Sequence, residues 1–508
     1  MSSALVITVL IAYFGVLLGI SFLTSKGADS ASFYSGNKQS PWYLVAFGMI
    51  GTSLSGVTFI SVPGTVGASG WYYYQLVLGF FIGYFVVAYV LLPLYYKYNL
   101  TSIYRYLELR LGFKAYQWGA GYFILSRTLG ATVRLYLVIN VMQLFVLDDI
   151  GIKFWQTTLI IMAMIVAYTL KGGVKTIVWT DTLQTLFMLL ALVVCIFSIQ
   201  EALGWDWSTL WHQMQEKDMT KLWSTDPMRK DFFLKHIIGG AFITITMTGL
   251  DQEMMQKNIS VKTLKDAQKN MVTFSFVLLV VNALFLLLGG VLYLYMQQKG
   301  LDFKPDDVFP SIVQHYLPKG IFLLFIIGLI SALFPSVDGA ITALTSSFSI
   351  DILGLQRRTD LSEKKQTYYR QIVHIGFAVL FTLLVFFFKW QDNKSIIDMI
   401  FLIAAYTYGP LLGLFAFGIL TKKKVKTVMI PIVCLISPLI CFALDVISSS
   451  YVVYFNENSS MYSMLDSLSK SMFHGYKFGN EMLLINGTIT FLLLYIFGKK
   501  QTLQEQLK

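Results

Sequence analysis

Asp338 lies in the middle of a long apolar segment, a position at which a charged side chain is costly and usually functional. Pro335 has no amide hydrogen, so it frees a backbone carbonyl and predicts a kink if the segment is helical. Thr342 and Thr345 follow at helical spacing and would extend Asp338 into a polar stripe. Because carboxylates, hydroxyls and free carbonyls suit an alkali cation, a cation site is the favoured interpretation. A carboxylate that carries a proton is the alternative.

Two arginines interrupt another apolar segment. Arg127 and Arg134 are seven residues apart, so on a helix they would lie on one face, two turns from each other. Arg127 is expected near the helix end, where its long side chain can reach the polar interface. Arg134 lies deeper and needs a partner. We favour an ion pair with a buried carboxylate such as Asp338 over direct contact with an anionic substrate.

Two further segments carry polar groups at membrane depth. Asp181 follows Trp179 and Thr180 near one end of the apolar run 175–200. The run Gly51–Thr58 is rich in glycine and small hydroxyl residues. Such a run can open the helical hydrogen bonds and expose carbonyls and hydroxyls to a small ligand. Close helix packing through small residues is an equally good explanation of the composition.

The composition defines the elements that must position these residues. The chain has 508 residues, of which 56% are hydrophobic and only 13% charged, with a mean hydropathy of +0.64. Soluble globular chains carry about 25% charged residues, so a soluble globule is excluded. The three cysteines lie in apolar runs and the five histidines are scattered, so neither a disulfide framework nor a transition-metal site is expected. The sequence predicts an all-α polytopic membrane protein.

About thirteen segments are long and apolar enough to cross a hydrocarbon core, which takes roughly 20 residues. They lie near 4–24, 42–62, 71–93, 117–147, 155–170, 175–200, 232–251, 270–296, 319–349, 372–389, 396–419, 425–446 and 482–497. The longest polar stretches, 201–231 and 447–481, are too short to bury a core of their own. We therefore expect residues 1–508 to form a single integral membrane domain.

The loop charges predict the orientation. Of the 39 Lys and Arg residues, 24 lie in or at the edges of the tail and the alternate loops that begin with 25–41, whereas 12 lie in or at the edges of the opposite loops. Positively charged loops stay in the cytoplasm, so the N-terminus is predicted outside and the C-terminus inside. The net charge of +11 is thus a topology signal, and nucleic-acid binding is not expected.

Five motifs resemble, in order along the chain, those of the sodium:solute symporter family, which includes carriers for sugars, proline, pantothenate, iodide and sialic acid. They are Phe33-Tyr-Ser-Gly-Asn with Pro41-Trp42, Thr101-Ser-Ile-Tyr-Arg-Tyr-Leu-Glu-Leu-Arg-Leu-Gly112, Gly172-Gly173 with Trp179-Thr-Asp-Thr-Leu-Gln184, Asp251-Gln252 with Gln256-Lys257, and Tyr408-Gly-Pro-Leu-Leu-Gly-Leu-Phe415. Each motif alone is weak evidence, but five in the family's order are strong evidence.

The resemblance implies a LeuT-like core of two inverted five-helix repeats. On the predicted spans these repeats are 42–200 and 232–419. A peripheral helix at 4–24 precedes them, two peripheral helices at 425–497 follow, and 498–508 is a cytoplasmic tail.

The resemblance also implies the ligand sites. The main sodium site of the family would use the carbonyls of Gly51, Leu54 and Ala332 and hydroxyls at positions 335 and 336. Here only Ser336 has a hydroxyl, because Pro335 has none. Asp338 falls where some relatives use a hydroxyl for a second sodium, beside the aspartate that matches Asp181. We therefore expect an altered sodium site that uses Asp338. The implied substrate contacts are Ser53, Ser55, Thr58 and Arg134.

These observations predict a secondary transporter of the plasma membrane, expected to be the cytoplasmic membrane of a bacterium. It would carry a small polar or anionic solute inward with sodium. Proton coupling within the same fold is the first alternative. An integral-membrane enzyme is disfavoured, because no catalytic constellation is found, and so is a sensor, because the chain ends eleven residues after the last span. The sequence leaves the oligomeric state open.

Overall fold

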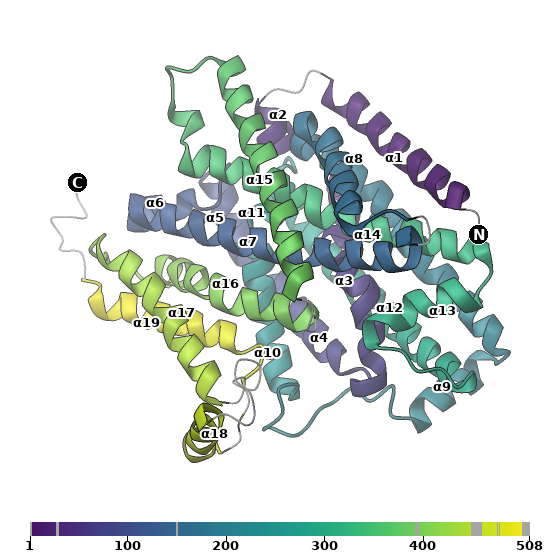
Figure 1. The fold of residues 1–508 in the computed structure, drawn as a ribbon. Helices are drawn as coiled ribbons and strands as arrows, with labels where there is room; N and C mark the ends of the chain where they lie inside the picture. The colour runs from purple at the N-terminus through teal and green to yellow at the C-terminus, as the bar shows by residue number, and fades with distance from the viewer. Residues whose placement is uncertain are drawn as a thin grey trace. The chain divides into compact units, whose positions relative to one another are not determined.

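The computed structural model describes residues 3–26, 30–148, 151–391, 396–448, 460–474, 476 and 478–499, and this part of the chain is helical and holds no β-strand (Figure 1). The α-helices are α1 (Ser3–Ser25), α2 (Ser30–Ser35), α3 (Trp42–Ser69), α4 (Tyr72–Val86), α5 (Leu92–Lys97), α6 (Arg105–Leu111), α7 (Phe113–Met142), α8 (Phe154–Leu203), α9 (Trp207–Glu216), α10 (Phe233–Thr244), α11 (Gln252–Ile259), α12 (Leu264–Gln298), α13 (Val308–Tyr316), α14 (Lys319–Ser347), α15 (Glu363–Gln391), α16 (Ile396–Leu420), α17 (Met429–Ser448), α18 (Ser460–Phe473) and α19 (Met482–Phe497).

Ten of the described helices are long and apolar enough to cross a membrane, and the bent pair α10 and α11 adds one more. Helix α8 has 50 residues, which is about 75 Å at 1.5 Å per residue and too long for one crossing of a core of roughly 30 Å. It covers two of the predicted spans. Each of the thirteen predicted segments overlaps one or more described helices, so their helical character is confirmed. The number of crossings and the orientation stay predictions.

The break inside α8 falls at a glycine pair that the sequence analysis placed between two spans. Gly173 has φ 55° and ψ −148°, a conformation that side chains rarely adopt. The backbone of Phe33 lies so close that a Cβ at position 173 would be 2.5 Å from its Cα atom. A glycine is therefore required here by both dihedral angle and space, and the two halves of α8 separate at this residue.

The chain divides into two compact units. The first contains residues 1–74, 127–222 and 253–400, and the second contains 75–126, 223–252 and 401–508. Each unit therefore combines segments from both of the predicted repeats. Within the first unit, α3 and α8 pack against each other, both pack against α12 and α14, and α1 lies along α8 (Figure 1). The predicted loop residues around Asn458 lie outside the described residues.

Candidate functional site

Helix α3 is interrupted at Ser55, whose φ of 38° and ψ of 170° are not helical. A break of this kind disturbs the helical hydrogen bonds of the turn before it, which here contains Gly51 through Leu54. The glycine- and hydroxyl-rich run was interpreted either as an opened helix or as close packing. The structure confirms the opened helix, and the two residues whose carbonyls were expected to bind a cation lie in the turn before the break.

The first half of α3 also packs closely. The amide of Gly51 donates a hydrogen bond to the Thr185 hydroxyl of α8 at 3.1 Å. A Cβ at Gly51 would lie 2.5 Å from that hydroxyl and 3.4 Å from the Pro335 ring of α14. The glycine thus lets α3 approach α8 and α14 together, and both interpretations of the run hold, each for a different part of it.

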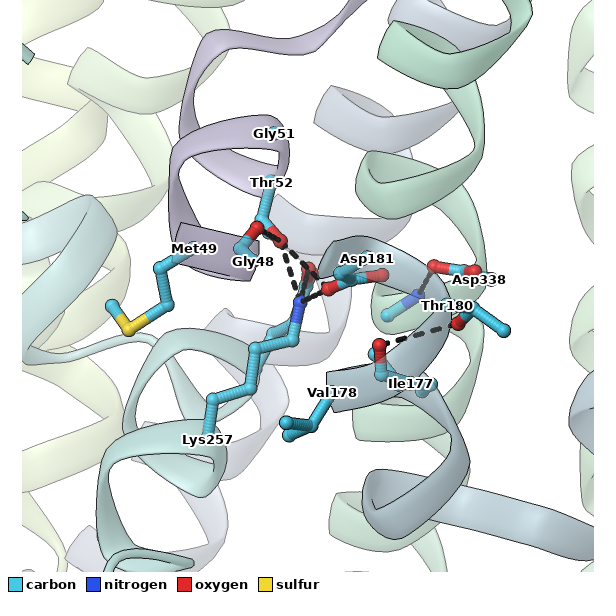
Figure 2. Close-up of polar contacts among 12 residues, drawn as sticks. Gly48, Met49, Gly51, Thr52, Ile177, Val178, Thr180, Asp181, Lys257 and Asp338 are labelled. Carbon is cyan, nitrogen blue, oxygen red and sulfur yellow. Dashed lines mark hydrogen bonds and ion pairs between the residues drawn. The ribbon is translucent and has the colours of Figure 1, made fainter. Parts of the chain in front are cut away.

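Asp181 of α8 forms a buried ion pair with Lys257 of α11. The Lys257 amine donates to Asp181 Oδ2 at 2.6 Å and to Thr52 Oγ1 at 2.6 Å. The Thr52 hydroxyl in turn donates to Asp181 Oδ2 at 3.1 Å. The two charged side chains are 4% and 1% exposed. Figure 2 shows the amine between α3 and α8, so three helices meet around one ammonium group.

Glu253 extends this cluster along α11. It lies one turn before Lys257, with Oε1 at 3.7 Å from the Lys257 amine. Its other carboxylate oxygen accepts a hydrogen bond from the Arg127 guanidinium of α7. Arg127 is buried, so the prediction that it extends to the polar interface is wrong. The reason is the acidic partner on α11, which holds the guanidinium inside the bundle.

Asp338 of α14 has a different environment. Its Oδ2 accepts a hydrogen bond from the Tyr168 hydroxyl of α8 at 2.6 Å, and its Oδ1 accepts one from the backbone amide of Gly339. Both donors are neutral. Among the described residues Asp338 makes no ion pair with Arg134, so that predicted pairing is wrong. Lys257 interacts with Asp338 through its charge, but its amine forms ion pairs with Asp181 and Glu253.

Of the other polar side chains on α14 near Asp338, some are free to bind a cation and others are held by hydrogen bonds. Helix α14 runs through Pro335 without a break, so the kink expected there does not open it. The Ser336 hydroxyl donates to the Leu333 carbonyl at 2.8 Å, which leaves its lone pairs free to bind a cation. The Thr345 hydroxyl instead contacts His374 and the Ile341 carbonyl, so the predicted stripe shortens to Asp338 and Thr342. The Thr342 hydroxyl is buried, with no hydrogen-bond partner in the described part of the chain.

The residues predicted to contact substrate lie in the same unit. Ser55 and Thr58 are buried and Ser53 is half-buried. Helix α7 packs against α3 directly after the break, since a Cβ at Gly56 would lie 2.2 Å from Val138 Cγ2. Arg134 lies one turn before Val138 and is half-buried. The structure thus places the arginine-bearing helix beside the opened part of α3, and substrate contact by these side chains stays a prediction.

The motif residues gather within the two units. In the first unit, Gln256 donates to the Tyr34 carbonyl at 2.6 Å, and Phe33 packs on Gly173. In the second, the Tyr408 hydroxyl donates to Asp251 at 2.7 Å, and Gln252 bonds to the backbone of the 101–112 motif. Motifs that are far apart in the sequence therefore meet in two buried clusters, one in each unit.

Lys257, Glu253 and Tyr168 are polar residues of the site that sequence reasoning missed. The segment Gln252–Ile259 is polar and short, so its sequence does not have the pattern of a membrane span. The available signal was the spacing of Glu253 and Lys257, which places an acid and a base on one helix face. No sequence signal singled out Tyr168 among 29 tyrosines.

Comparisons with known proteins agree with the geometry. The sodium:solute symporter family model matches residues 33–427. The sodium/sialic acid symporter SiaT of Proteus mirabilis is 23% identical, over 82% of this chain and 84% of that protein. The sodium-coupled monocarboxylate transporter 1 of Homo sapiens is 26% identical, over 79% and 67%. The solved substrate-bound outward-open state of a Na⁺-coupled sialic acid symporter has a TM-score of 0.81 at 19% identity, covering 98% of this chain and 99% of that one.

The long apolar helices define a multi-pass helical membrane protein, and its fold is similar to that of the solved Na⁺-coupled sialic acid symporter. The chain belongs to the sodium:solute symporter family, because the family match covers most of its length. The family and the relatives named above are named as symporters or transporters.

Proposed function

We propose that this chain is a sodium-coupled symporter that carries a small polar or anionic solute into the cell by alternating access. The opened turn of α3 next to α14 is the observation that supports it most directly. The carbonyls of Gly51, Leu54 and Ala332, the hydroxyl of Ser336 and the carboxylate of Asp338 are oxygen ligands of the kind that sodium takes.

In the proposed mechanism sodium ties α3 to α14. An ion shared by the two helices favours the conformation in which its ligands lie together, and thereby the state that binds solute. Solute then binds at Ser53, Ser55, Thr58 and Arg134, and rocking of the helices releases both ligands on the other side. The cluster around Lys257 keeps α3 and α8 together through this cycle.

The solute is proposed to carry a carboxylate. The relatives named above transport sialic acid or monocarboxylates, and Arg134 offers a guanidinium that suits a carboxylate. Uptake by proteoliposomes of sialic acid, of a short monocarboxylate and of a neutral hexose, each with sodium and with potassium, tests this. Hexose uptake alone would contradict the role of Arg134 but not the coupling.

Proton coupling remains the second candidate, because the partners of Asp338 are neutral and a proton could also neutralise it. Uptake against sodium concentration at pH 6 and pH 8 separates the two. We expect uptake to follow sodium at both pH values. Sodium-independent uptake that follows the pH gradient would overturn sodium coupling and support the proton mechanism.

The proposed orientation has the N-terminus outside and the C-terminus inside a bacterial plasma membrane. The native cysteines should not react with a labelling reagent, because all three are buried: Cys195, Cys434 and Cys441. A Lys423→Cys variant should react only from the cytoplasmic side, and Asn458→Cys only from outside. External labelling at 423 would overturn the orientation.

A further inference from the structure

The Lys257 amine occupies oxygen atoms that a second cation would need. It lies 2.6 Å from both Asp181 Oδ2 and Thr52 Oγ1, and 3.7 Å from Glu253 Oε1. These are the carboxylate and hydroxyl ligands that an alkali ion prefers. The resemblance to the family implied a secondary sodium at Asp181. The residues present do not fit that ion, because an ammonium group already holds the carboxylate.

A sodium ion added at Asp181 would also meet a like charge at contact distance. The amine is buried between α3, α8 and α11, where charges repel each other more strongly than they do in bulk water. The second carboxylate oxygen, Oδ1, has no hydrogen-bond partner among the described residues. One oxygen beside a fixed ammonium is a poor site for a free cation.

The charges of the cluster point to one missing cation. Three buried carboxylates and two buried bases lie within it, namely Asp181, Glu253, Asp338, Lys257 and Arg127. With all five ionised, one negative charge is left. It falls on Asp338, because the two bases contact the other two carboxylates. A single monovalent ion at Asp338 completes the balance.

We propose that Lys257 is a tethered substitute for the second coupling cation, so that this symporter binds one sodium ion per molecule, at Asp338. The inference rests on the proposed sodium coupling. The ammonium group would hold α3 to α8 permanently. A bound sodium ion would hold the two helices together only while the site is occupied. The Lys257 side chain would thereby limit the number of sodium ions that are transported with each solute to one.

Equilibrium binding of radioactive sodium to purified protein tests the proposal without a solute. Choline replaces sodium at constant ionic strength, and sodium-dependent thermal stabilisation is measured in parallel, because its dependence on ion concentration reports the number of ions bound. We expect one sodium per wild-type molecule and two for Lys257→Gln, whose neutral amide vacates the site. Lys389→Gln is the matched control, since the Lys389 amine contacts neutral partners: the Asn140 amide oxygen at 3.0 Å and the Phe154 ring, whose centroid is 5.3 Å away. It should bind one.

The outcomes separate this inference from the proposed function. Two ions bound by the wild type, or one by Lys257→Gln, would overturn the role of Lys257 and leave sodium coupling intact. Wild-type protein that binds no sodium, with one site gained in Lys257→Gln, would overturn the proposed coupling and support the tethered cation. No sodium binding by either protein would overturn both.

Poor folding of Lys257→Gln would still be informative. If sodium stands in for the missing ammonium, membranes prepared in sodium should yield more folded variant than membranes prepared in choline. Equal low yields in both salts, with recovery in the double variant Asp181→Asn and Lys257→Gln, would show that the pair serves structure alone and would overturn the proposal.

Discussion

Asp181 and Asp338 lie in the same unit, on helices that pack together, yet their partners differ in kind. Asp181 contacts an ammonium group and a hydroxyl, whereas Asp338 contacts a phenol and a backbone amide. The first carboxylate has its countercharge in the protein. The second can gain one only from a bound ion or a proton. The comparison teaches that depth alone does not make a carboxylate an ion site, because the charge of its partner decides.

The largest effect is expected at the paired carboxylate. Asp181→Asn leaves the Lys257 charge without its main partner, and breaking a buried ion pair in this way costs about 3–5 kcal/mol. The thermal midpoint and the folded yield should both fall. The double variant with Lys257→Met should recover part of the loss, since it removes both charges. If Asp181→Asn were as stable as the wild type, the claim that only Asp181 has a stabilising countercharge in the protein would be contradicted.

The next effect is expected at Asp338 and concerns ion binding. Asp338→Asn keeps the size of the side chain but removes the charge, so sodium activation of uptake should weaken at least about tenfold, which is roughly 1.4 kcal/mol. Asp181→Asn protein that folds should show a smaller change. Asp351→Asn, at another buried aspartate of the same unit, is the control. An unchanged sodium curve in Asp338→Asn would assign that residue to structure.

Tyr168→Phe sharpens the comparison by removing a neutral donor. A hydrogen bond to a charged group contributes about 1.5–3 kcal/mol, so the variant should melt at lower temperature in choline. Sodium should then stabilise it more than the wild type, because the carboxylate has lost a competing partner. Tyr13→Phe is the matched control, since its hydroxyl contacts the neutral Ser331 at 2.6 Å. Equal sodium responses in both variants would contradict the idea.

The smallest effect is expected at Thr342, whose hydroxyl lies one turn beyond Asp338. Thr342→Val should raise the sodium concentration for half-maximal uptake about two- to tenfold, in keeping with the loss of one ligand worth about 0.5–1.5 kcal/mol. Thr345→Val should leave it unchanged, because that hydroxyl contacts His374 and the Ile341 carbonyl. The reverse ranking would place the ion on another face of α14.

The sequence predicted the helices and the breaks because both are local. The glycine pair at 172–173 and the run at 51–58 determine backbone conformation within a few residues, and both lie at interruptions in the structure. The partners of the charges were not predictable in this way. Lys257 meets Asp181 across 76 residues of chain, and hydropathy treats each segment separately. Arg134 was proposed for Asp338 because it lay in an apolar run, whereas the bases that complete the cluster come partly from a short polar helix.

The buried cluster also has a consequence for how the protein is made. Its five charged side chains extend along the chain from Arg127 to Asp338. A ribosome that has released α7 and α8 has delivered Arg127 and Asp181 to the membrane while their partners on α11 are still unsynthesised. Charges in a bilayer cost several kcal/mol without partners, so nascent chains shorter than about residue 260 should hold these helices loosely. Truncations that end before α11 should therefore be degraded faster than truncations that end after it.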